Sequence, residues 1–265
     1  RERGAGKLSL GSSLDGLGDA HDLVRGQKGA FQGLVETAAM LRRDFPQVSF
    51  GFNFTVLPGN CRELWPAYRF VTEDLGAWFC AQLVVNHQGY EAPETFQWTP
   101  AQRRETAHQI DLILADICRK NNALKHLVRG EERRYQWLWE RLLYWRYLQR
   151  YALKPKRFFK DCMAGQRFAM FDPEGNLFYC PVNKHRSIGN VSEKPLDLLW
   201  TSQKADEERA YVDSCRCDCW LNCISNPILE RLMSKAADIG RRRPSRNEPA
   251  QTPGRRLRAT EPRPD

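Results

Sequence analysis

The sequence predicts an α/β protein that begins with a parallel sheet or barrel, and three observations support this prediction. Strand-like and helix-like segments alternate through the first third of the 265-residue chain, a pattern typical of parallel sheets. A stretch with helical periodicity follows. The cysteines then gather in the last third, beside a hairpin pattern. A chain of this length can hold one large domain or two smaller ones, each with its own core.

The first strand and first helix come from the first 46 residues. Residues 7–13, KLSLGSS, form a short apolar run that ends in small polar residues and predicts a strand. Residues 16–29 are rich in glycine and charge, so we expect a loop there. From Ala30 the apolar residues recur at helical spacing, and Pro46 ends the predicted helix.

Two more strands follow, with a helix between them. Strict alternation of apolar residues over 48–56 predicts a strand. Asn60 and Glu63 resemble a capping box, which would open a helix that Gly76 closes. Residues 78–85, WFCAQLVV, predict a third buried strand. This order of strands and helices is the pattern of a parallel sheet or barrel.

Two long helices are predicted in the middle of the chain. Thr99, the proline after it and Gln102 give a helix start with a capping box, and the helix should run to about Arg119. A second helix, over residues 131–151, is dense in tyrosine and tryptophan. We interpret this aromatic stripe as packing rather than as the wall of a substrate site. A helix that lies on a membrane surface is a lesser alternative.

The last third changes character. Residues 167–171 and 176–180 flank a Pro-Glu-Gly turn, so they predict a β-hairpin. Residues 195–200 predict a short helix. Residues 241–265 hold eight arginines, three acidic residues and five prolines, which is the composition of a disordered tail.

Charge and composition limit the partners and the location. The net charge is +9, but more than half of it lies in residues 241–265, so the body gives little support for a nucleic-acid partner. No apolar run approaches the length of a membrane span. The chain starts with Arg1, without a signal peptide, so we expect a piece of a longer, cytoplasmic protein.

The cysteines are the strongest chemical signal. Nine cysteines in a chain without signs of secretion favour a metal or catalytic role over a disulfide framework. Cys61, Cys80 and Cys118 stand alone, and we expect them to be small core residues. The other six lie at the hairpin and in the run SCRCDCWLNC; they are Cys162, Cys180, Cys215, Cys217, Cys219 and Cys223.

These six thiols predict a metal centre. Alternate residues of an extended chain share a face, and residues four apart share one on a helix, so the thiols of the run can converge. Thiolates at close quarters repel one another unless a cation neutralises them. Zinc sites often use paired C-x2-C units, which are absent, whereas an iron–sulfur cluster commonly takes four cysteines. Unligated thiols or adventitious disulfides are the alternative.

Several spaced elements agree in their order with a known family. Cys162 is followed by Gly175 and Cys180, then by IGNV at 188–191, LDLLW at 196–200 and the cysteine run. This order resembles the auxiliary iron–sulfur domain, of SPASM or Twitch type, found in radical S-adenosylmethionine (SAM) enzymes. The resemblance covers roughly residues 158–226.

The first third resembles the same enzymes. Residues 12–31, SSLDGLGDAHDLVRGQKGAF, are similar to the segment after the fourth strand of the radical SAM barrel. The resemblance implies that Ser13 contacts the bound S-adenosylmethionine and that Asp15 orients the loop. It also implies that Arg25 pairs with a carboxylate of the cofactor, or braces Asp15 or Asp22. Turn capping is an equally good role for Asp15.

The resemblance gives a full fold class and a set of domains. We expect the C-terminal half of a partial (β/α)6 radical SAM barrel at 1–90, with strands four to six of the family. A helical connector would follow at 91–157, then a small β-hairpin-plus-helix iron–sulfur domain at 158–226. A C-terminal helix at 227–240 and a disordered basic tail at 241–265 complete the chain.

The catalytic cluster loop of the family, C-x3-C-x2-C, is missing from this sequence. Cys219 and Cys223 have the first spacing, but Asn226 stands where a third cysteine is required. We therefore expect a chain truncated at its N-terminus and inactive by itself. One auxiliary [4Fe-4S] cluster is expected on Cys162, Cys180, Cys219 and Cys223, with Cys217 as the substitute and Cys215 as the spare; two clusters with non-cysteine ligands remain open.

Two hypotheses of different class follow. The first is a fragment of a radical SAM oxidoreductase or maturase, which would act on a peptide, a protein or a small metabolite and take electrons from an external donor. The second is a non-catalytic module that binds an iron–sulfur cluster or zinc and recognises a partner. A zinc-ribbon binder of nucleic acid is a distant third, since only Arg209 and Arg216 lie near the cysteines in the sequence.

Overall fold

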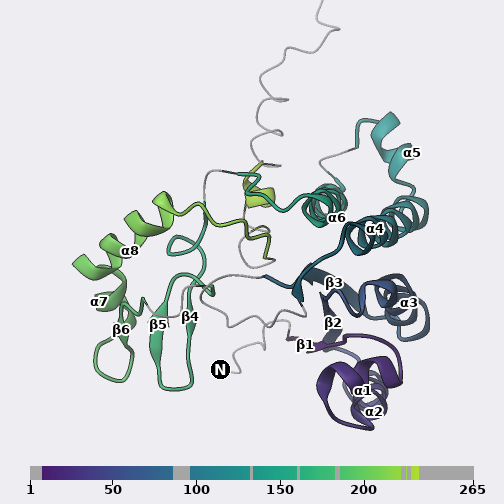
Figure 1. The fold of residues 1–265 in the computed structure, drawn as a ribbon, viewed down its shortest axis with the longest axis horizontal. Helices are drawn as coiled ribbons and strands as arrows, with labels where there is room; N and C mark the ends of the chain where they lie inside the picture. Colours follow the sequence, from purple (N-terminus) through teal and green to yellow (C-terminus); the bar gives the residue numbers. More distant parts are fainter. Residues whose placement is uncertain are drawn as a thin grey trace, which may run out of the picture.

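The protein has a sheet-and-helix part and a smaller hairpin unit (Figure 1). The computed structural model describes residues 8–85, 96–131, 134–159, 162–182, 186–221, 225 and 228–232. Cys223, the expected tail at 241–265 and most of the expected helix at 227–240 lie outside these residues, although 228–232 are helical. In the part of the chain that the structure describes, no helix combines the length and the apolar character needed to cross a membrane.

The three expected strands form one parallel sheet. They are β1 (Ser9–Ser13), β2 (Ser49–Val56) and β3 (Trp78–Leu83), and their order in the sheet is their order in the chain. Both neighbouring pairs are parallel. Helix α2 (Ala30–Asp44) connects β1 to β2 and ends just before Pro46, as the sequence predicts. The alternation of strands and helices therefore gives the expected parallel sheet.

One face of the sheet forms the core. Phe52, Phe54 and Val56 of β2 are at most 1% exposed, and Phe79 and Leu83 of β3 are at most 4% exposed. Full burial of each such side chain stabilises a protein by about 1.5–3 kcal/mol. The alternating apolar residues of β2 thus supply the buried face of this strand.

The opposite face of the sheet is polar and carries small residues. Strand register places Gly11 and Gly51 in one row with Trp78. A Cβ atom on Gly51 would lie 2.1 Å from the Trp78 ring and 2.4 Å from the Trp78 carbonyl oxygen. The next row holds Ser13 and Asn53, which are exposed, beside Cys80. The two glycines therefore leave room for the indole across this face.

The expected loop at 16–29 is wrong in part, because it contains helix α1 (Asp19–Arg25). Gly26 ends this helix with φ of 65°, the left-handed conformation that glycine adopts readily. Asp22 of α1 accepts hydrogen bonds from the backbone N–H groups of Gly29 (2.5 Å) and Phe31 (2.8 Å). These two bonds lower the pKa of Asp22 and cap the start of α2.

The capping box expected at Asn60 is also wrong. Its side chain makes no cap and is instead buried against more distant backbone. The Asn60 amide donates to the carbonyl oxygens of Asp15 (2.9 Å) and Thr55 (3.1 Å), and its Oδ1 accepts from Leu57 N–H (2.6 Å). Glu63 accepts from the N–H of Leu17. Asn60 therefore ties the loop after β1 to the end of β2.

The chain between β2 and β3 is helical, as expected, in three joined pieces. They are the 3-10 turn η1 (Cys61–Glu63), helix α3 (Leu64–Arg69) and the π-helical turn η2 (Phe70–Asp74). Helix α4 (Pro100–Lys120) packs against them and starts with the predicted capping box of Thr99 and Gln102.

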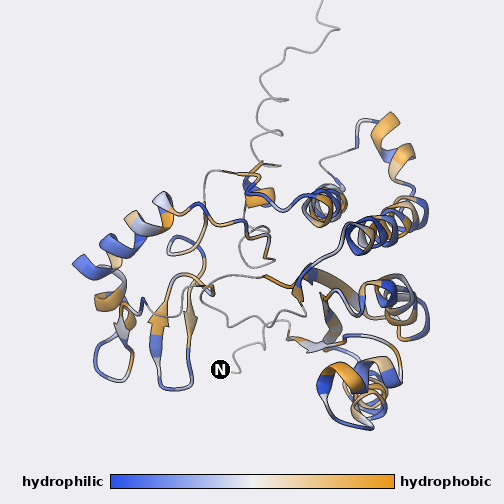
Figure 2. Cartoon of the chain, in the orientation of Figure 1, coloured by the Kyte–Doolittle hydropathy of each residue, from blue (hydrophilic) through white to orange (hydrophobic). Residues whose placement is uncertain are grey.

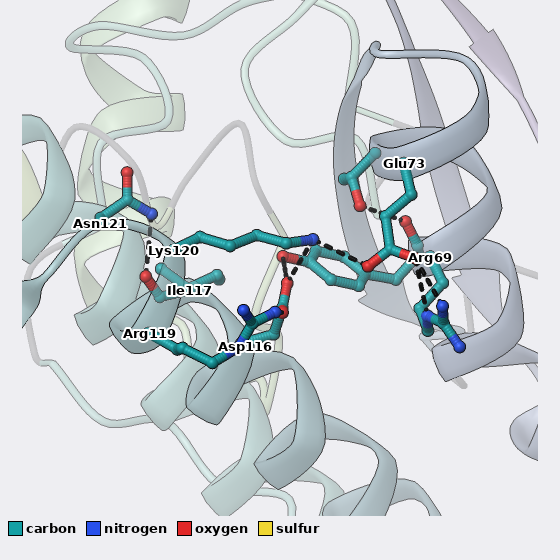
Figure 3. A network of polar contacts seen from close by, with 9 residues as sticks. Arg69, Glu73, Asp116, Ile117, Arg119, Lys120 and Asn121 are labelled. Atoms are coloured by element: carbon teal, nitrogen blue, oxygen red, sulfur yellow. Dashed lines mark hydrogen bonds and ion pairs between the residues drawn. The ribbon is translucent and has the colours of Figure 1, made fainter.

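A network of polar contacts around the buried carboxylate of Asp116 joins α3 and η2 to α4 (Figure 3). The hydroxyl of Tyr68 donates to Asp116 Oδ2 at 3.0 Å, and Lys120 Nζ contacts the same oxygen at 2.8 Å. Lys120 also contacts Glu73 at 3.0 Å. Burial acts to raise the pKa of Asp116, but the hydrogen bonds from Lys120, Arg119 and Tyr68 outweigh it and lower that pKa.

The aromatic helix is α6 (Gln136–Leu153), and it begins and ends later than the expected range 131–151. Tyr144, Trp145 and Tyr151 are buried in the core, which confirms the packing interpretation for these residues. The short helix α5 (Ala123–Val128), which lies between α4 and α6, was not predicted. It projects from the body with an apolar surface (Figures 1 and 2), where Leu124 is 73% exposed.

The hairpin unit contains the expected antiparallel strands, here β4 (Met170–Phe171) and β5 (Asn176–Phe178). A third strand, β6 (Gly189–Asn190), extends the sheet beyond the prediction. The expected short helix is α7 (Leu196–Trp200). Helix α8 (Gln203–Ser214) follows and was not predicted. Figure 1 shows this unit on the other side of β1–β3 from α3.

Candidate metal centre

Five of the six expected ligands line one cavity, which we call the thiol cavity. They come from three places: Cys162 precedes the hairpin, Cys180 follows β5, and the rest follow α8. The cavity has a volume of about 20 Å³. Its walls are Arg157, Cys162, Ala164, Cys180, Val182, Tyr211, Val212, Cys215, Cys217 and Cys219. The sixth expected ligand, Cys223, lies outside the described residues.

The hairpin turn sets the place of Cys180. Gly175 has φ of 85°, which glycine tolerates better than other residues. Asp172 accepts hydrogen bonds from the backbone N–H of Asn176 at 2.7 Å and from its side-chain amide at 2.8 Å. The turn thereby brings β5 back along β4, so that Cys180 returns to the neighbourhood of Cys162.

Arg209 of α8 holds the hairpin unit together from inside. Its guanidinium donates to the carbonyl oxygens of Gly165 (3.0 Å) and Trp200 (2.7 Å) and to the hydroxyl of Tyr179 (2.8 Å). It also pairs with Asp206 at 2.7 Å. These contacts fix α8 against the hairpin and so position the cysteine run that begins where α8 ends. The guanidinium of Arg209 therefore makes these contacts within the hairpin unit itself.

Two thiols of the run lie side by side. The Sγ atoms of Cys217 and Cys219 are 3.4 Å apart. Hydrogen bonds from the thiols of Cys219 and Cys215 lower the pKa of Cys217 to about 5, whereas that of Cys219 is raised, because its proton is held in the shared hydrogen bond and its thiol is buried. Thiolate is the form of cysteine that binds metal, so the lowered pKa of Cys217 favours metal binding at this pair.

Arg157 is the positive charge beside the thiols. It lines the thiol cavity, its Nε donates to the carbonyl oxygen of Phe159 at 2.9 Å, and its guanidinium also donates to the carbonyl oxygen of Cys215. The charge of Arg157 helps to lower the pKa of Cys217. A guanidinium in this place favours deprotonated thiols and a negatively charged guest.

The donor set fits an iron–sulfur cluster, but the space is small. Cysteine thiolates are the usual ligands of such clusters, and five of them face the thiol cavity. The volume of about 20 Å³ is enough for about one water molecule, so a cluster would require the thiols to move apart. Among the described residues, no group of three or more His, Cys, Asp or Glu side chains is placed to hold a metal ion.

Two further cavities share Cys217 and Cys219 with the thiol cavity. The first, which we call the inner cavity, also has a volume of about 20 Å³. Its walls are Arg157, Phe158, Phe159, Cys162, Cys217, Cys219, Trp220, Ser225 and Ile228. The second, the sheet-side cavity, has a volume of about 160 Å³. Its walls are Leu83, Val84, Val85, Trp98, Arg103, Tyr151, Pro155, Cys217, Asp218 and Cys219.

The sheet-side cavity lies where β3 ends. In parallel sheets the carboxyl ends of the strands are the usual place for ligands. The guanidinium of Arg103 lies over the ring of Trp98, 5.6 Å from its centre, and donates to the carbonyl oxygen of Ala152. Burial lowers the pKa of Arg103. The cavity therefore offers a partly buried cation and two aromatic walls beside the cysteine run.

The three residues expected near the cofactor all lie where β1 ends. Ser13 is exposed at the end of the strand, on the polar face. Asp15 is 4% exposed and pairs with Arg25 at 2.7 Å. The backbone N–H of Asp15 donates to Nδ1 of the buried His21 at 3.1 Å. Arg25 therefore braces Asp15, one of the alternatives left by the sequence, and none of the three lines the thiol cavity.

The three isolated cysteines also lie away from the thiol cavity. Cys61 is buried in η1, as expected for a core residue, and Cys80 is partly buried in β3. Cys118 is exposed on α4, so the expectation of a core position is wrong there. Cys118 directly follows the buried Ile117, and successive residues of an α-helix point about 100° apart, so it does not share the direction of Ile117.

Comparison with known families agrees with the cysteine pattern. Residues 162–220 match the SPASM family, which is described as an iron-sulfur cluster-binding domain. The matched stretch begins at Cys162 and includes all five cysteines of the thiol cavity. No curated protein matches the chain. This part of the chain is therefore similar to a domain that binds an iron–sulfur cluster.

Sequence reasoning missed three residues around the thiols. Arg157 lies five residues before Cys162, at the end of the expected helical connector 91–157. Trp220 and Ser225 lie within or just after the cysteine run and carry no motif of their own. A signal existed for Trp220, because a large aromatic residue next to a candidate ligand cysteine needs a buried place to pack.

Proposed function

We propose that the chain binds one auxiliary [4Fe-4S] cluster in the thiol cavity and forms part of a radical SAM enzyme. The convergence of five cysteines from three segments on one cavity carries the proposal. Cys162, Cys180 and Cys219 are the proposed ligands among the described residues, and Cys223 is the fourth. Cys217 is the alternative candidate in this ligand set, and Cys215 is the spare.

The sheet supports the wider assignment. Three parallel strands in consecutive order, with an apolar face under helices and a polar face with small residues, suit one side of a barrel whose interior binds substrate. Ser13 is exposed on that polar face and is the proposed contact for S-adenosylmethionine. Asp15 and Arg25 would hold the loop after β1 in place.

Within the proposed function, the residues of this chain have separate tasks. A bound auxiliary cluster supplies a one-electron redox centre or a Lewis-acidic anchor. Arg157 would balance the negative charge of the thiolates. The sheet-side cavity would hold part of a peptide, protein or small-metabolite substrate, with Arg103 as the cation and Trp98 as a stacking surface. Electrons would come from an external donor.

The deciding experiment is the metal content of the anaerobically purified protein. We expect about four irons and four acid-labile sulfides per chain, with the broad visible absorption of an iron–sulfur cluster. Stoichiometric zinc without sulfide would instead favour a structural metal module. Because the sequence has no C-x3-C-x2-C loop, the chain by itself should form no 5′-deoxyadenosine from S-adenosylmethionine under reducing conditions.

A further inference from the structure

Two buried polar groups beside the thiols have no hydrogen-bond partner among the residues that the structure describes. They are the indole Nε1 of Trp220 and the hydroxyl of Ser225. Trp220 is 4% exposed and Ser225 is 1% exposed. A buried donor without a partner destabilises the folded state. Two such groups at one place therefore require an explanation.

Trp220 and Ser225 both line the inner cavity, together with Cys162, Cys217 and Cys219. The other walls are Arg157, Phe158, Phe159 and Ile228. Three of these side chains, those of Arg157, Trp220 and Ser225, carry N–H or O–H donors. The hydroxyl of Ser225 is the one oxygen acceptor among the side chains of the walls. The remaining side-chain acceptors are sulfur atoms. This composition suits a guest that is negatively charged and accepts hydrogen bonds.

The ring of Trp220 cannot turn easily to find another partner. It packs against two rings of α6, those of Tyr144 at 6.1 Å and Tyr147 at 5.4 Å between centroids. It also packs against Phe158 at 5.5 Å and Phe159 at 6.0 Å. An indole nitrogen can only donate. The four rings therefore hold the indole of Trp220 in place beside the inner cavity.

We propose that the N–H of Trp220 and the hydroxyl of Ser225 donate hydrogen bonds to the sulfur atoms of Cys162 and Cys219, the proposed ligands that line both the inner cavity and the thiol cavity, and so raise the reduction potential of the bound cluster. This inference rests on the proposed function. Reduction adds negative charge to the cluster and its thiolates, so donors stabilise the reduced state more than the oxidised state. Hydrogen bonds to sulfur are among the factors that set these potentials.

A trapped water molecule is the competing explanation. The inner cavity has a volume of about 20 Å³, which is enough for one water. A water there would accept from Trp220 and bind Ser225 whether or not the cluster is present. It would contribute to stability and leave the potential of the cluster unchanged, so the two explanations differ in a measurable quantity.

The test compares Trp220→Phe and Ser225→Ala with the wild-type protein, all with the cluster bound. Each variant removes one donor and keeps most of the side-chain volume. We expect full iron and sulfide content and a more negative midpoint potential for each, by redox titration with electron paramagnetic resonance. Ser225→Thr keeps the hydroxyl and should restore the wild-type potential.

Trp139→Phe is the matched control. Trp139 on α6 also has a buried indole nitrogen without a partner among the described residues, but it lines none of the three cavities of the cysteine run. Its loss should leave the potential unchanged. Should Trp220→Phe disturb packing and lose cluster, Ser225→Ala alone decides the question, because it removes a single oxygen atom.

Three results would overturn the inference. Unchanged potentials in both loaded variants would assign the donors to a water. An equally large shift of the midpoint potential in Trp139→Phe would show that the effect of Trp220→Phe is not specific to the inner cavity. Loss of iron from Ser225→Ala would make the hydroxyl a ligand rather than a donor. If the wild-type protein itself holds no iron and sulfide, the proposed function fails first, so the two failures are distinguishable.

Discussion

Tyr144 joins the parallel sheet to the cysteine run through Trp220. Its hydroxyl donates to the carbonyl oxygen of Ala81 in β3 at 2.6 Å, and its ring stacks on the indole of Trp220 with an interplanar angle of 21°. Trp220 directly follows Cys219. One side chain of α6 thus connects the strand that ends at the sheet-side cavity with the thiols.

Tyr144→Phe should weaken this connection without removing the ring. The variant leaves a buried carbonyl oxygen without this donor, which costs about 1–3 kcal/mol. Chemical denaturation of the apo protein should show the loss. Tyr147→Phe is the control, because Tyr147 also contacts Trp220 through its ring, but among the described residues its hydroxyl makes no hydrogen bond to the sheet. Equal stability of Tyr144→Phe and the wild type would contradict the role of the hydroxyl.

Asp116 makes stability depend on pH in acid. Its pKa is lowered from an ordinary value of 3.8, so the ionised carboxylate stabilises the fold above that value. This contribution is lost as the pH falls through the folded-state pKa. The difference in unfolding free energy between the wild type and Asp116→Asn should therefore shrink as the pH falls below 3.8. A difference that stays constant down to strong acid would refute the ion-pair network.

Gly51→Ala should destabilise the sheet strongly. The new methyl group would lie 2.1 Å from the Trp78 ring and 2.4 Å from its carbonyl oxygen, so backbone as well as side chain must shift. Overpacking of this kind costs about 1–3 kcal/mol. Thermal unfolding can measure it. Gly33→Ala is the control, since a methyl group there meets nothing within 4 Å, and it should be neutral or stabilising in α2.

Cys180→Ala should remove the cluster and destabilise the hairpin unit, because metal binding and folding are coupled. Iron and sulfide analysis after anaerobic purification gives the result. Cys118→Ala is the control, since this cysteine is exposed on α4 and lies outside the thiol cavity. Full metal content in Cys180→Ala would show that the ligand assignment is wrong.

Arg157→Met should lower the retention of the cluster more than Arg157→Lys. Lysine keeps the positive charge but cannot reproduce the planar guanidinium that donates to both Phe159 and Cys215. The half-life of the visible absorption in the presence of an iron chelator measures retention. If both the Arg157→Met and Arg157→Lys variants retain the cluster as long as the wild type does, the charge of Arg157 has no part in cluster binding.

Regular elements with strong local signals could be predicted from the sequence. The alternating residues of β2 and the capping box at Thr99 are such signals, and both agree with the structure. Helices α1 and α8 were missed for physical reasons. Glycines surround α1, and α8 is polar on most of its surface, with Ala205, Glu208 and Val212 as its buried residues.

The site could be predicted as far as it depends on local spacing. The cysteines of the thiol cavity were all candidates, because their spacing in the chain is the signal. Asn60 shows the limit, since its neighbours in sequence suggest a helix cap but its side chain bonds to Asp15, 45 residues away. Arg157 likewise reaches the carbonyl oxygen of Cys215 across 58 residues. Such contacts depend on tertiary packing.

The cysteine run also limits how this protein can be altered. Cys217 and Cys219 contribute to the walls of all three cavities, so one substitution there changes three compartments at once. We therefore expect selection or engineering for a new ligand to act on the cavity walls that the cysteines do not form. Trp98 and Arg103 border only the sheet-side cavity among these three. They are the positions where ligand preference can change while the thiols stay constant.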